Sequence, residues 1–294
     1  MNKSAFEIVA RVLCPAVLAM TASVCAMGQA ATARPSPQPS PANEVHARVT
    51  ETLIDSGIRD DQAVDQMLAA YSPKVKALDT VIGNLKGELR KGGTGAGSLG
   101  NFVTNGILAE ARKKLKKPIA LAVTNGGGLR KNTIGEGPLR ERDIFELLPF
   151  ENALVAFDLT GAQVMDLLNV VIGHRDAQAG ARIKYRTNAE KKAEVVSARL
   201  LVDGWEKEID PAATYTVISI DYLFKRQSST PSESEGNYSV FTQAKNIQPL
   251  GITIRDAIID YVKSETAAGR EIKAALDGRF VFEKSEASEG EPPR

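Results

Sequence analysis

The sequence has few cysteines and histidines. Its only two cysteines, Cys14 and Cys25, lie in an apolar N-terminal stretch, so a chain processed after that stretch would form no disulfide bonds. The two histidines, His46 and His174, lie far apart, and no HExxH, paired CxxC, GxSxG or P-loop pattern accompanies them. The sequence therefore predicts no metal site, no cofactor and no catalytic residue in this chain.

The sequence also lacks an excess of charge of one sign and a long apolar run. Lysine and arginine total 37 and aspartate and glutamate 36, which gives a net charge of +1. This balance gives no electrostatic basis for binding nucleic acid or an anionic membrane. The most apolar run, residues 12–26, is too short to span a bilayer, so no transmembrane helix is predicted.

The N-terminus has the pattern of a secretory signal peptide. Lys3 and Arg11 precede the apolar run, and small residues follow it. We therefore expect residues 1–30 to be removed and the protein to be exported, to the periplasm or out of the cell. A lipoprotein anchor at Cys25 is the less favoured alternative.

The remaining chain divides into a linker, one domain and a tail. Residues 31–45 are rich in proline and serine and predict a linker, residues 46–284 form one domain, and residues 285–294 form a disordered tail. Helices and strands without strict alternation predict an α+β fold, with a mixed sheet flanked by helices. Hydrophobic periodicity and capping signals predict helices at 60–78, 99–115, 140–148, 160–172 and 253–263, and strands at 81–89, 119–123, 153–159, 195–202, 205–209 and 214–220.

The sequence Asn-Gly-Gly-Gly-Leu-Arg at residues 125–130, here called the glycine loop, follows a predicted strand. Three glycines allow the backbone to turn with positive φ and to lie directly against a ligand. The Asn125 amide and the Arg130 cation flank this bare backbone, which suits a polar anionic molecule. A structural turn followed by a surface arginine explains the six residues equally well.

Several motifs occur together in one order. They are Leu99-Gly100-Asn101, the glycine loop, Leu148-Pro149-Phe150-Glu151-Asn152, Leu159-Thr160-Gly161, Asp221-Tyr222-Leu223, Tyr238 with Phe241, and Thr253-Ile254-Arg255-Asp256-Ala257. In this order and spacing they resemble the C-terminal, substrate-recognition domain of the 5′-nucleotidases, over about residues 50–282.

The resemblance implies a set of ligand contacts. In that family an N-terminal metallophosphoesterase domain holds two metals and the attacking water, and the C-terminal domain grips the nucleoside. Phe150 and Tyr222 would stack on the two faces of the base, each contributing about 1–3 kcal/mol. Carried over residue by residue, the substrate-binding set is Asn125, Gly127, Gly128, Arg130, Phe150, Tyr222 and Asn237.

Two segments depart from the family pattern. The family has an arginine shortly before the Leu-Gly-Asn motif, whereas residues 94–98 contain none, so Arg90 or Lys91 would have to supply this charge. A polar insertion at 225–234 precedes the position of the family aspartate that holds the ribose. Glu235 or Asn237 would take its place.

The expected function is recognition of a nucleotide or nucleoside in a 5′-nucleotidase-type hydrolase of nucleotide catabolism. A separate metallophosphoesterase subunit would hold the divalent metals, and this chain would not hydrolyse nucleotides alone. One alternative is a stand-alone periplasmic nucleoside- or nucleotide-binding protein. Another is a structural domain that no longer binds a ligand.

Overall fold

The computed structural model describes residues 49–202, 204–225 and 238–283. By its internal contacts the chain divides into two units, Met1–Arg59 and Asp60–Arg294. Residues 49–59 contain no helix or strand, and all the secondary structure discussed below belongs to the second unit. The predicted signal peptide, linker and tail lie outside the described residues, as does Asn237, and they stay predictions.

The single helix predicted over 60–78 is wrong, because the structure has two short helices there. They are α2 (Gln62–Ala69) and α3 (Ser72–Ala77). Pro73 lies in the first turn of α3 and has no N–H to continue a helix from α2, so the helix breaks before it. The apolar residues that suggested the helix are all exposed, namely Val64, Met67, Leu68 and Tyr71.

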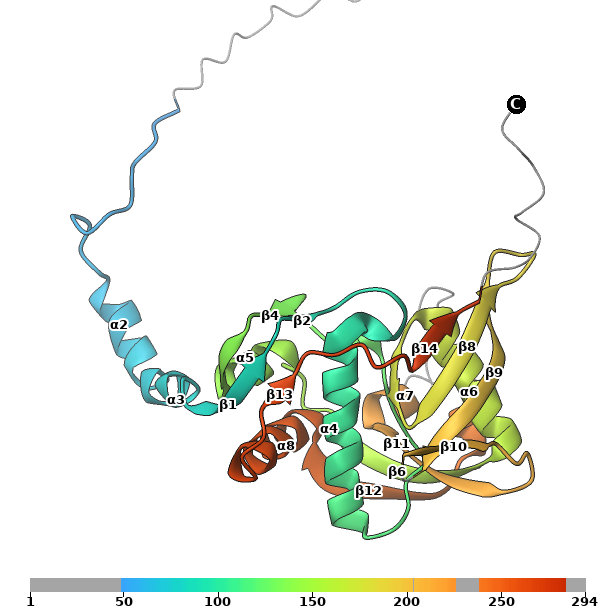
Figure 1. Cartoon of the computed structure of the whole chain (residues 1–294). Helices are drawn as coiled ribbons and strands as arrows, with labels where there is room; N and C mark the ends of the chain where they lie inside the picture. Colours follow the sequence, from blue (N-terminus) through green and yellow to red (C-terminus); the bar gives the residue numbers. More distant parts are fainter. Residues whose placement is uncertain (1–48, 203, 226–237, 284–294) are drawn as a thin grey trace, which may run out of the picture. The chain divides into compact units, whose positions relative to one another are not determined.

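A five-stranded mixed sheet lies at the centre of the second unit (Figure 1). Strand β3 pairs in parallel with β11, whereas the β11–β6, β6–β12 and β3–β7 pairs are antiparallel. This arrangement confirms the predicted α+β fold with a mixed sheet. The strands, in spatial order, are β12 (Lys245–Thr253), β6 (Ala153–Thr160), β11 (Thr214–Ile220), β3 (Leu121–Thr124) and β7 (Ala177–Ala179).

Three smaller sheets accompany it within the described residues. One has the order β10 (Trp205–Glu208), β9 (Ala193–Val202), β8 (Ala181–Thr187) and β14 (Phe280–Phe282). The hairpin predicted between 195–202 and 205–209 is confirmed by the β9–β10 pair, which opposes Trp205 and Val202. The others combine β13 (Ile272–Lys273), β1 (Val81–Lys86) and β5 (Gly137–Arg140), and β2 (Leu89–Arg90) with β4 (Thr133–Ile134).

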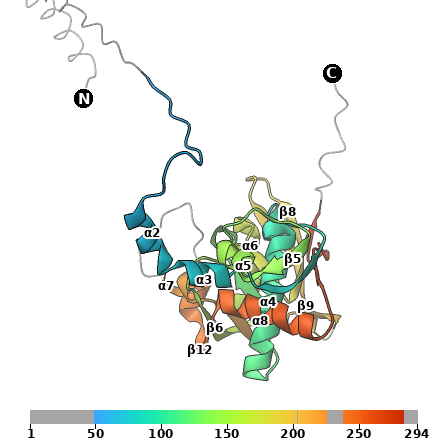
Figure 2. The same cartoon turned by 90° about the vertical axis from the view of Figure 1, so that its left-hand side faces the viewer.

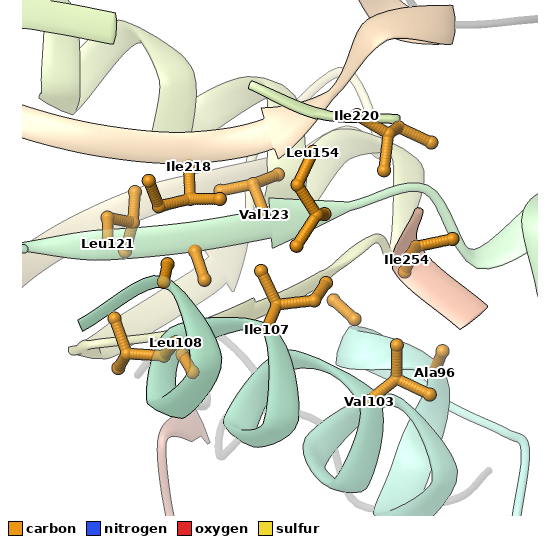
Figure 3. Packing of buried hydrophobic residues seen from close by; sticks show 14 of the residues in the cluster. Ala96, Val103, Ile107, Leu108, Leu121, Val123, Leu154, Ile218, Ile220 and Ile254 are labelled. Atoms are coloured by element: carbon orange, nitrogen blue, oxygen red, sulfur yellow. The ribbon is translucent and has the colours of Figure 1, made fainter. Parts of the chain in front are cut away.

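Helices cover the central sheet and complete the core. The predicted amphipathic helix is α4 (Gly97–Leu115), which packs on β3 and β7 and lies beside α8 (Ile254–Ala267) (Figure 2). Figure 3 shows Ile107 and Leu108 of α4 beneath Leu121 and Val123 of β3, all four buried. Helix α6 (Gly161–His174) packs on both β6 and β9, and α5 (Glu141–Leu147) packs on α8.

Local capping signals begin α6 and α8. Thr160 and Gln163 form the predicted capping box: the Gln163 N–H donates to Thr160 Oγ1 at 3.3 Å, and Gln163 Oε1 accepts from the Thr160 N–H. At α8, Thr253 Oγ1 accepts from the Asp256 N–H, but the Asp256 carboxylate accepts from the Thr253 hydroxyl rather than from its backbone. Thr253 and Asp256 therefore form only one of the two hydrogen bonds of a capping box.

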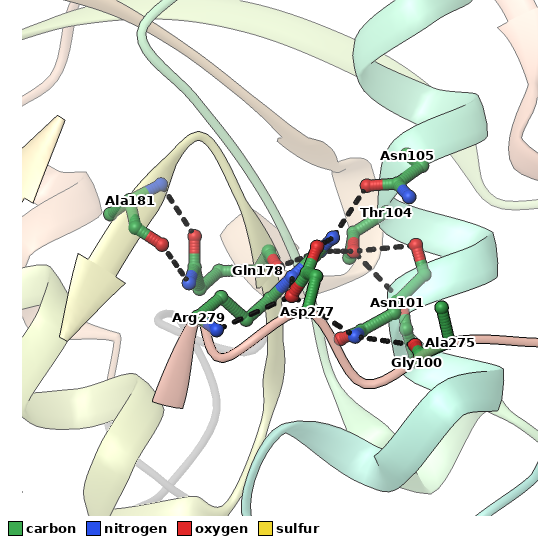
Figure 4. Close-up of polar contacts among 9 residues, drawn as sticks. All are labelled: Gly100, Asn101, Thr104, Asn105, Gln178, Ala181, Ala275, Asp277 and Arg279. Atoms are coloured by element: carbon green, nitrogen blue, oxygen red, sulfur yellow. Dashed lines mark hydrogen bonds and ion pairs between the residues drawn. The ribbon is translucent and has the colours of Figure 1, made fainter. Parts of the chain in front are cut away.

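A buried arginine ties the C-terminal strand to the core (Figure 4). Arg279 is 6% exposed and immediately precedes β14. Its guanidinium donates to the Gln178 carbonyl at 2.8 Å, to Asn105 Oδ1 at 2.8 Å and to Thr104 Oγ1 at 3.2 Å. Its Nε also donates to Asp277 Oδ1 at 2.8 Å. The short strand β14 is thus joined to α4 and β7 through one side chain.

Candidate functional site

The candidate site lies at one edge of the five-stranded sheet. Because β3 and β11 are parallel, their carboxyl ends meet at this edge, and the antiparallel neighbours β6 and β7 begin there. The glycine loop follows β3, Tyr222 follows β11, and Phe150 precedes β6. In open, mostly parallel sheets, ligands bind outside the carboxyl ends of the strands. The topology thus places these three predicted parts of the site at the same edge.

The glycine loop forms a single 3₁₀ turn, η2 (Gly126–Gly128). None of its three glycines has a positive φ, so the conformational reason expected for them is wrong. At Gly128 the reason is space, since a Cβ atom there would lie 3.2 Å from Asn125 Oδ1. The loop ends where the Arg130 N–H donates to the Leu147 carbonyl at 2.8 Å, and Gly127 is exposed.

Asn125 has an unsatisfied acceptor. Its Oδ1 is buried and has no hydrogen-bond partner among the described residues. Buried polar atoms without partners are rare in folded proteins and call for a specific explanation. The carbonyl oxygen lies at the start of the glycine loop, packed against Gly128.

Arg130, the last residue of the loop, lies next to Phe150. The guanidinium carbon of Arg130 is 5.8 Å from the centroid of the Phe150 ring, a cation–π distance. Phe150 is 48% exposed, so its ring is not part of the hydrophobic core. The site therefore presents a cation beside an open aromatic face.

Lys91, rather than Arg90, reaches the glycine loop. Lys91 Nζ donates to the Leu129 carbonyl at 2.8 Å, whereas the Arg90 guanidinium pairs with Glu88. Partial burial, and secondarily the nearby charge of Arg130, lower the pKa of Lys91. Two cations thus flank the loop, and Lys91 lies where a replacement for the missing family arginine was sought.

Arg255 fixes the segment around Phe150, residues 148–151, through hydrogen bonds and an ion pair. This buried side chain donates to the Leu148 carbonyl at 3.4 Å and to the Pro149 carbonyl at 3.3 Å, and forms an ion pair with Glu151 at 2.9 Å. The sequence analysis named Arg255 as part of the motif at residues 253–257 and predicted no role for it. Its role in fixing the Phe150 segment is visible only in three dimensions.

Tyr222 lies in the first turn of α7 (Asp221–Lys225). Strand β11 ends two residues earlier, at Ile220. The Ala153 N–H donates to Asp221 Oδ1 at 3.0 Å, which joins the start of α7 to the start of β6. The Tyr222 side chain is 38% exposed. It leaves the sheet at the same edge as Phe150, from the neighbouring strand.

The space between these elements is small. A hollow of about 10 Å³, room for about one water molecule, lies between Gly128, Phe150, Asn152, Ile220 and Ile254. A nucleoside is far too large for it. A flat ligand would therefore lie on the exposed Phe150 ring rather than inside a closed cavity of this chain.

Asp176, which sequence reasoning did not identify, connects the glycine loop to Tyr238. Its buried carboxylate accepts from the Gly126 N–H at 2.7 Å and from the Tyr238 hydroxyl at 2.6 Å, and His174 Nδ1 lies 3.9 Å away. Burial raises the pKa of Asp176, against the opposing effect of these hydrogen bonds. Burial, and then the facing carboxylate, also raise the pKa of Tyr238. One carboxyl group thus fixes the amide of the loop's first glycine.

Within the described residues, the structure contains neither a candidate metal-binding group nor a candidate membrane-spanning helix. In the ranges 49–202, 204–225 and 238–283, no three or more histidine, cysteine, aspartate and glutamate side chains are grouped so that they could hold a metal ion. Over the same ranges, no helix combines the length and apolar character needed to cross a membrane.

Comparisons with known proteins agree on one family. A family model described as 5′-nucleotidase, C-terminal domain, matches residues 78–232, more than half of the chain. The trifunctional nucleotide phosphoesterase protein YfkN of Bacillus subtilis (strain 168) is 25% identical over 240 residues, covering 78% of this chain and 15% of that protein. A 5′-nucleotidase of Vibrio vulnificus (strain CMCP6) is 28% identical over 182 residues, covering 60% of this chain and 31% of that protein.

The fold also matches a solved structure. The 5′-nucleotidase precursor from Thermus thermophilus superposes with a TM-score of 0.62 at 24% identity, covering 75% of this chain and 43% of that one. The chain thus spans less than half the length of each of these relatives.

Proposed function

Since the chain belongs to the family of 5′-nucleotidase C-terminal domains, we propose that it recognises a nucleotide or nucleoside at the edge formed by the glycine loop, Phe150 and Tyr222. The observation that carries the proposal is the convergence of these three segments at the carboxyl ends of β3 and β11. Asn237 is proposed as a further contact on the family resemblance alone.

The chemistry of this edge suits a flat base that carries an anionic group. The open ring of Phe150 offers a stacking surface, which contributes about 1–3 kcal/mol per base. Lys91 and Arg130 supply positive charge beside it. Asn125 is proposed as a contact on the family resemblance, because its buried Oδ1 would reach a ligand only if the loop moved. Gly127 and Gly128 keep the backbone between these groups free of side chains.

We assign hydrolysis to a second polypeptide. The described residues include no group of three or more histidine, cysteine, aspartate and glutamate side chains that could hold a metal ion. A separate metallophosphoesterase subunit would hold the divalent metals and the attacking water. This chain would then bind and orient the nucleotide without a catalytic residue of its own.

The test is to measure AMP hydrolysis by a candidate metallophosphoesterase with and without the purified chain. We expect the wild-type chain to increase the rate. The Phe150→Ala variant should raise the KM for AMP roughly ten- to hundredfold at a similar kcat, because the lost stacking energy belongs to binding.

The matched control is Trp205→Ala, which removes an aromatic side chain that is 76% exposed on β10 and is expected to leave the KM unchanged. No rate gain with any exported metallophosphoesterase would overturn the two-subunit proposal. Calorimetric binding of AMP to the chain alone, lost in Phe150→Ala, would then favour a stand-alone binding protein. Absence of binding as well would favour a structural domain.

We further propose that the chain acts outside the cytoplasm, because residues 1–30 have the signal-peptide pattern. N-terminal sequencing of the protein from the periplasmic or culture fraction should show a new terminus near residue 30. A lipid-modified Cys25 would identify the anchored alternative. Recovery of the uncleaved chain from the cytoplasm would contradict export.

A further inference from the structure

A second, much larger hollow lies where the end of α6 meets the turn between β8 and β9. Its volume is about 590 Å³, and its described lining shares no residue with the hollow beside the glycine loop. The side chains that matter for its chemistry are His174, Arg175, Tyr185, Lys191, Lys192 and Phe282. A volume of this order accommodates a small organic molecule.

The described lining is positively charged. Arg175, Lys191 and Lys192 contribute three cations, and no aspartate or glutamate is among the described lining residues. Lys192 pairs with the exposed Glu190 at 3.2 Å, whereas Arg175 and Lys191 form no ion pair within the part of the chain that the structure describes. The helix dipole favours a cation such as Arg175 at the C-terminus of α6. It does not explain Lys191 and Lys192, which lie in the turn between β8 and β9.

Two of these cations occupy unfavourable backbone positions. Arg175 caps α6 with φ 58°, and Lys191 has φ 61° in the turn. Glycine or asparagine adopts this left-handed conformation at a lower cost than a long side chain. Two elements thus carry cations where the backbone favours other residues, and both cations line the same hollow. Lys116 also has φ 50° at the end of α4 without lining the hollow, so the shared hollow, rather than the backbone conformation, points to a ligand.

One part of the wall is aromatic. The rings of Tyr185 and Phe282 lie 5.4 Å apart, edge to face, and join β8 to β14 at the hollow. We propose that this hollow binds a small phosphate ester that carries an aromatic ring. The phosphate would lie among the three cations and the ring against Tyr185 and Phe282. His174 adds a polar group next to Asp176, which holds the glycine loop.

The test is calorimetric titration of the full mature chain with phenyl phosphate. We expect saturable binding that weakens as salt is added, because charge contacts at a surface are screened. Inorganic phosphate lacks the ring and phenol lacks the charge, so each should bind more weakly than phenyl phosphate. Absence of saturable phenyl phosphate binding would overturn the proposal.

Variants locate the binding without disturbing the fold. The Arg175→Gly and Lys191→Gly double variant removes two cations and relieves two left-handed positions. It should therefore weaken binding roughly tenfold or more while the melting temperature is unchanged or raised. Lys207→Met, at an exposed lysine on β10, is the matched control and should bind normally. Binding that survives the double variant, or that is lost in Phe150→Ala, would overturn the assignment.

Discussion

Replacement of Arg279 by methionine is expected to lower the free energy of unfolding by about 3–5 kcal/mol. The methionine would fill much of the volume but would leave the Gln178 carbonyl, Asn105 Oδ1 and Thr104 Oγ1 without their shared donor. An unpaired buried acceptor costs about 1–3 kcal/mol, which applies to the Gln178 carbonyl and Thr104 Oγ1, whereas water can replace the donor at the exposed Asn105. Urea denaturation followed by circular dichroism measures it.

A matched control shows whether the loss of stability in Arg279→Met is specific to this buried arginine. Arg186 on β8 pairs with Glu194 at 2.8 Å, but its side chain is 53% exposed. The Arg186→Met variant should therefore lose less than about 1 kcal/mol. Arg279→Lys should fall between the two, because an ammonium group cannot donate in the directions of a guanidinium fork. Equal losses for Arg279→Met and Arg186→Met would contradict the prediction.

Replacement of Asp176 by alanine is expected to destabilise the protein by about 2–4 kcal/mol and to free the glycine loop. The buried Tyr238 hydroxyl and the Gly126 N–H would both lose their acceptor, at about 1–3 kcal/mol each. Asp176→Asn keeps an oxygen for Gly126 and an amide for Tyr238, so its loss should be smaller. Hydrogen exchange at Gly126 should rise strongly in the alanine variant and little in the asparagine variant.

The same carboxyl group predicts a pH dependence. The pKa of Asp176 is raised above 3.8, so between the two pKa values the folded state holds a proton that the unfolded chain has released. The stabilising contribution of Asp176 is therefore greatest at low pH and falls as the pH rises from about 3.8 through the raised pKa. Above that window the cost of ionising the buried group is constant.

Asp176→Asn removes this titration, while His174 and Tyr238, the facing titratable groups, remain. The difference in unfolding free energy, wild type minus Asp176→Asn, should thus be largest at low pH and decrease across the window. Urea denaturation at a series of pH values gives this difference directly. A difference that is independent of pH, or that grows as the pH rises, would contradict the raised pKa.

Local signals explain what could be predicted from sequence. The Thr160 cap, the apolar spacing of α4 and the alternation of β11 depend on residues a few positions apart, and the structure confirms each element. The same reasoning failed over 60–78, where apolar spacing outweighed the proline that divides α2 from α3. Periodicity reports which side of a helix is apolar, but not whether anything covers it.

Contacts between segments far apart in the sequence explain why other parts of the site could not be predicted. The glycine loop was recognised from six consecutive residues, but its support by Asp176 joins positions 50 apart, and the Asp176–Tyr238 bond spans 62 residues. Lys91 was expected only as one of two possible cations, since its reach to Leu129 depends on how β2 lies beside the loop. A buried aspartate between Arg175 and Ala177 carries no sequence pattern that distinguishes it from an exposed one.

The parallel pairing of β3 with β11 has a consequence for how the chain folds. The Ser219 hydroxyl donates to the Val123 carbonyl, 96 residues earlier, so the centre of the sheet closes a long loop. Contacts of such high sequence separation form slowly, because the entropy of loop closure is lost before the pairing is gained. During synthesis on the ribosome, β3 would emerge well before β11, and its apolar residues would stay exposed until β11 pairs with it. The carboxyl edge at which the candidate site lies can therefore form only after β11 has been synthesised.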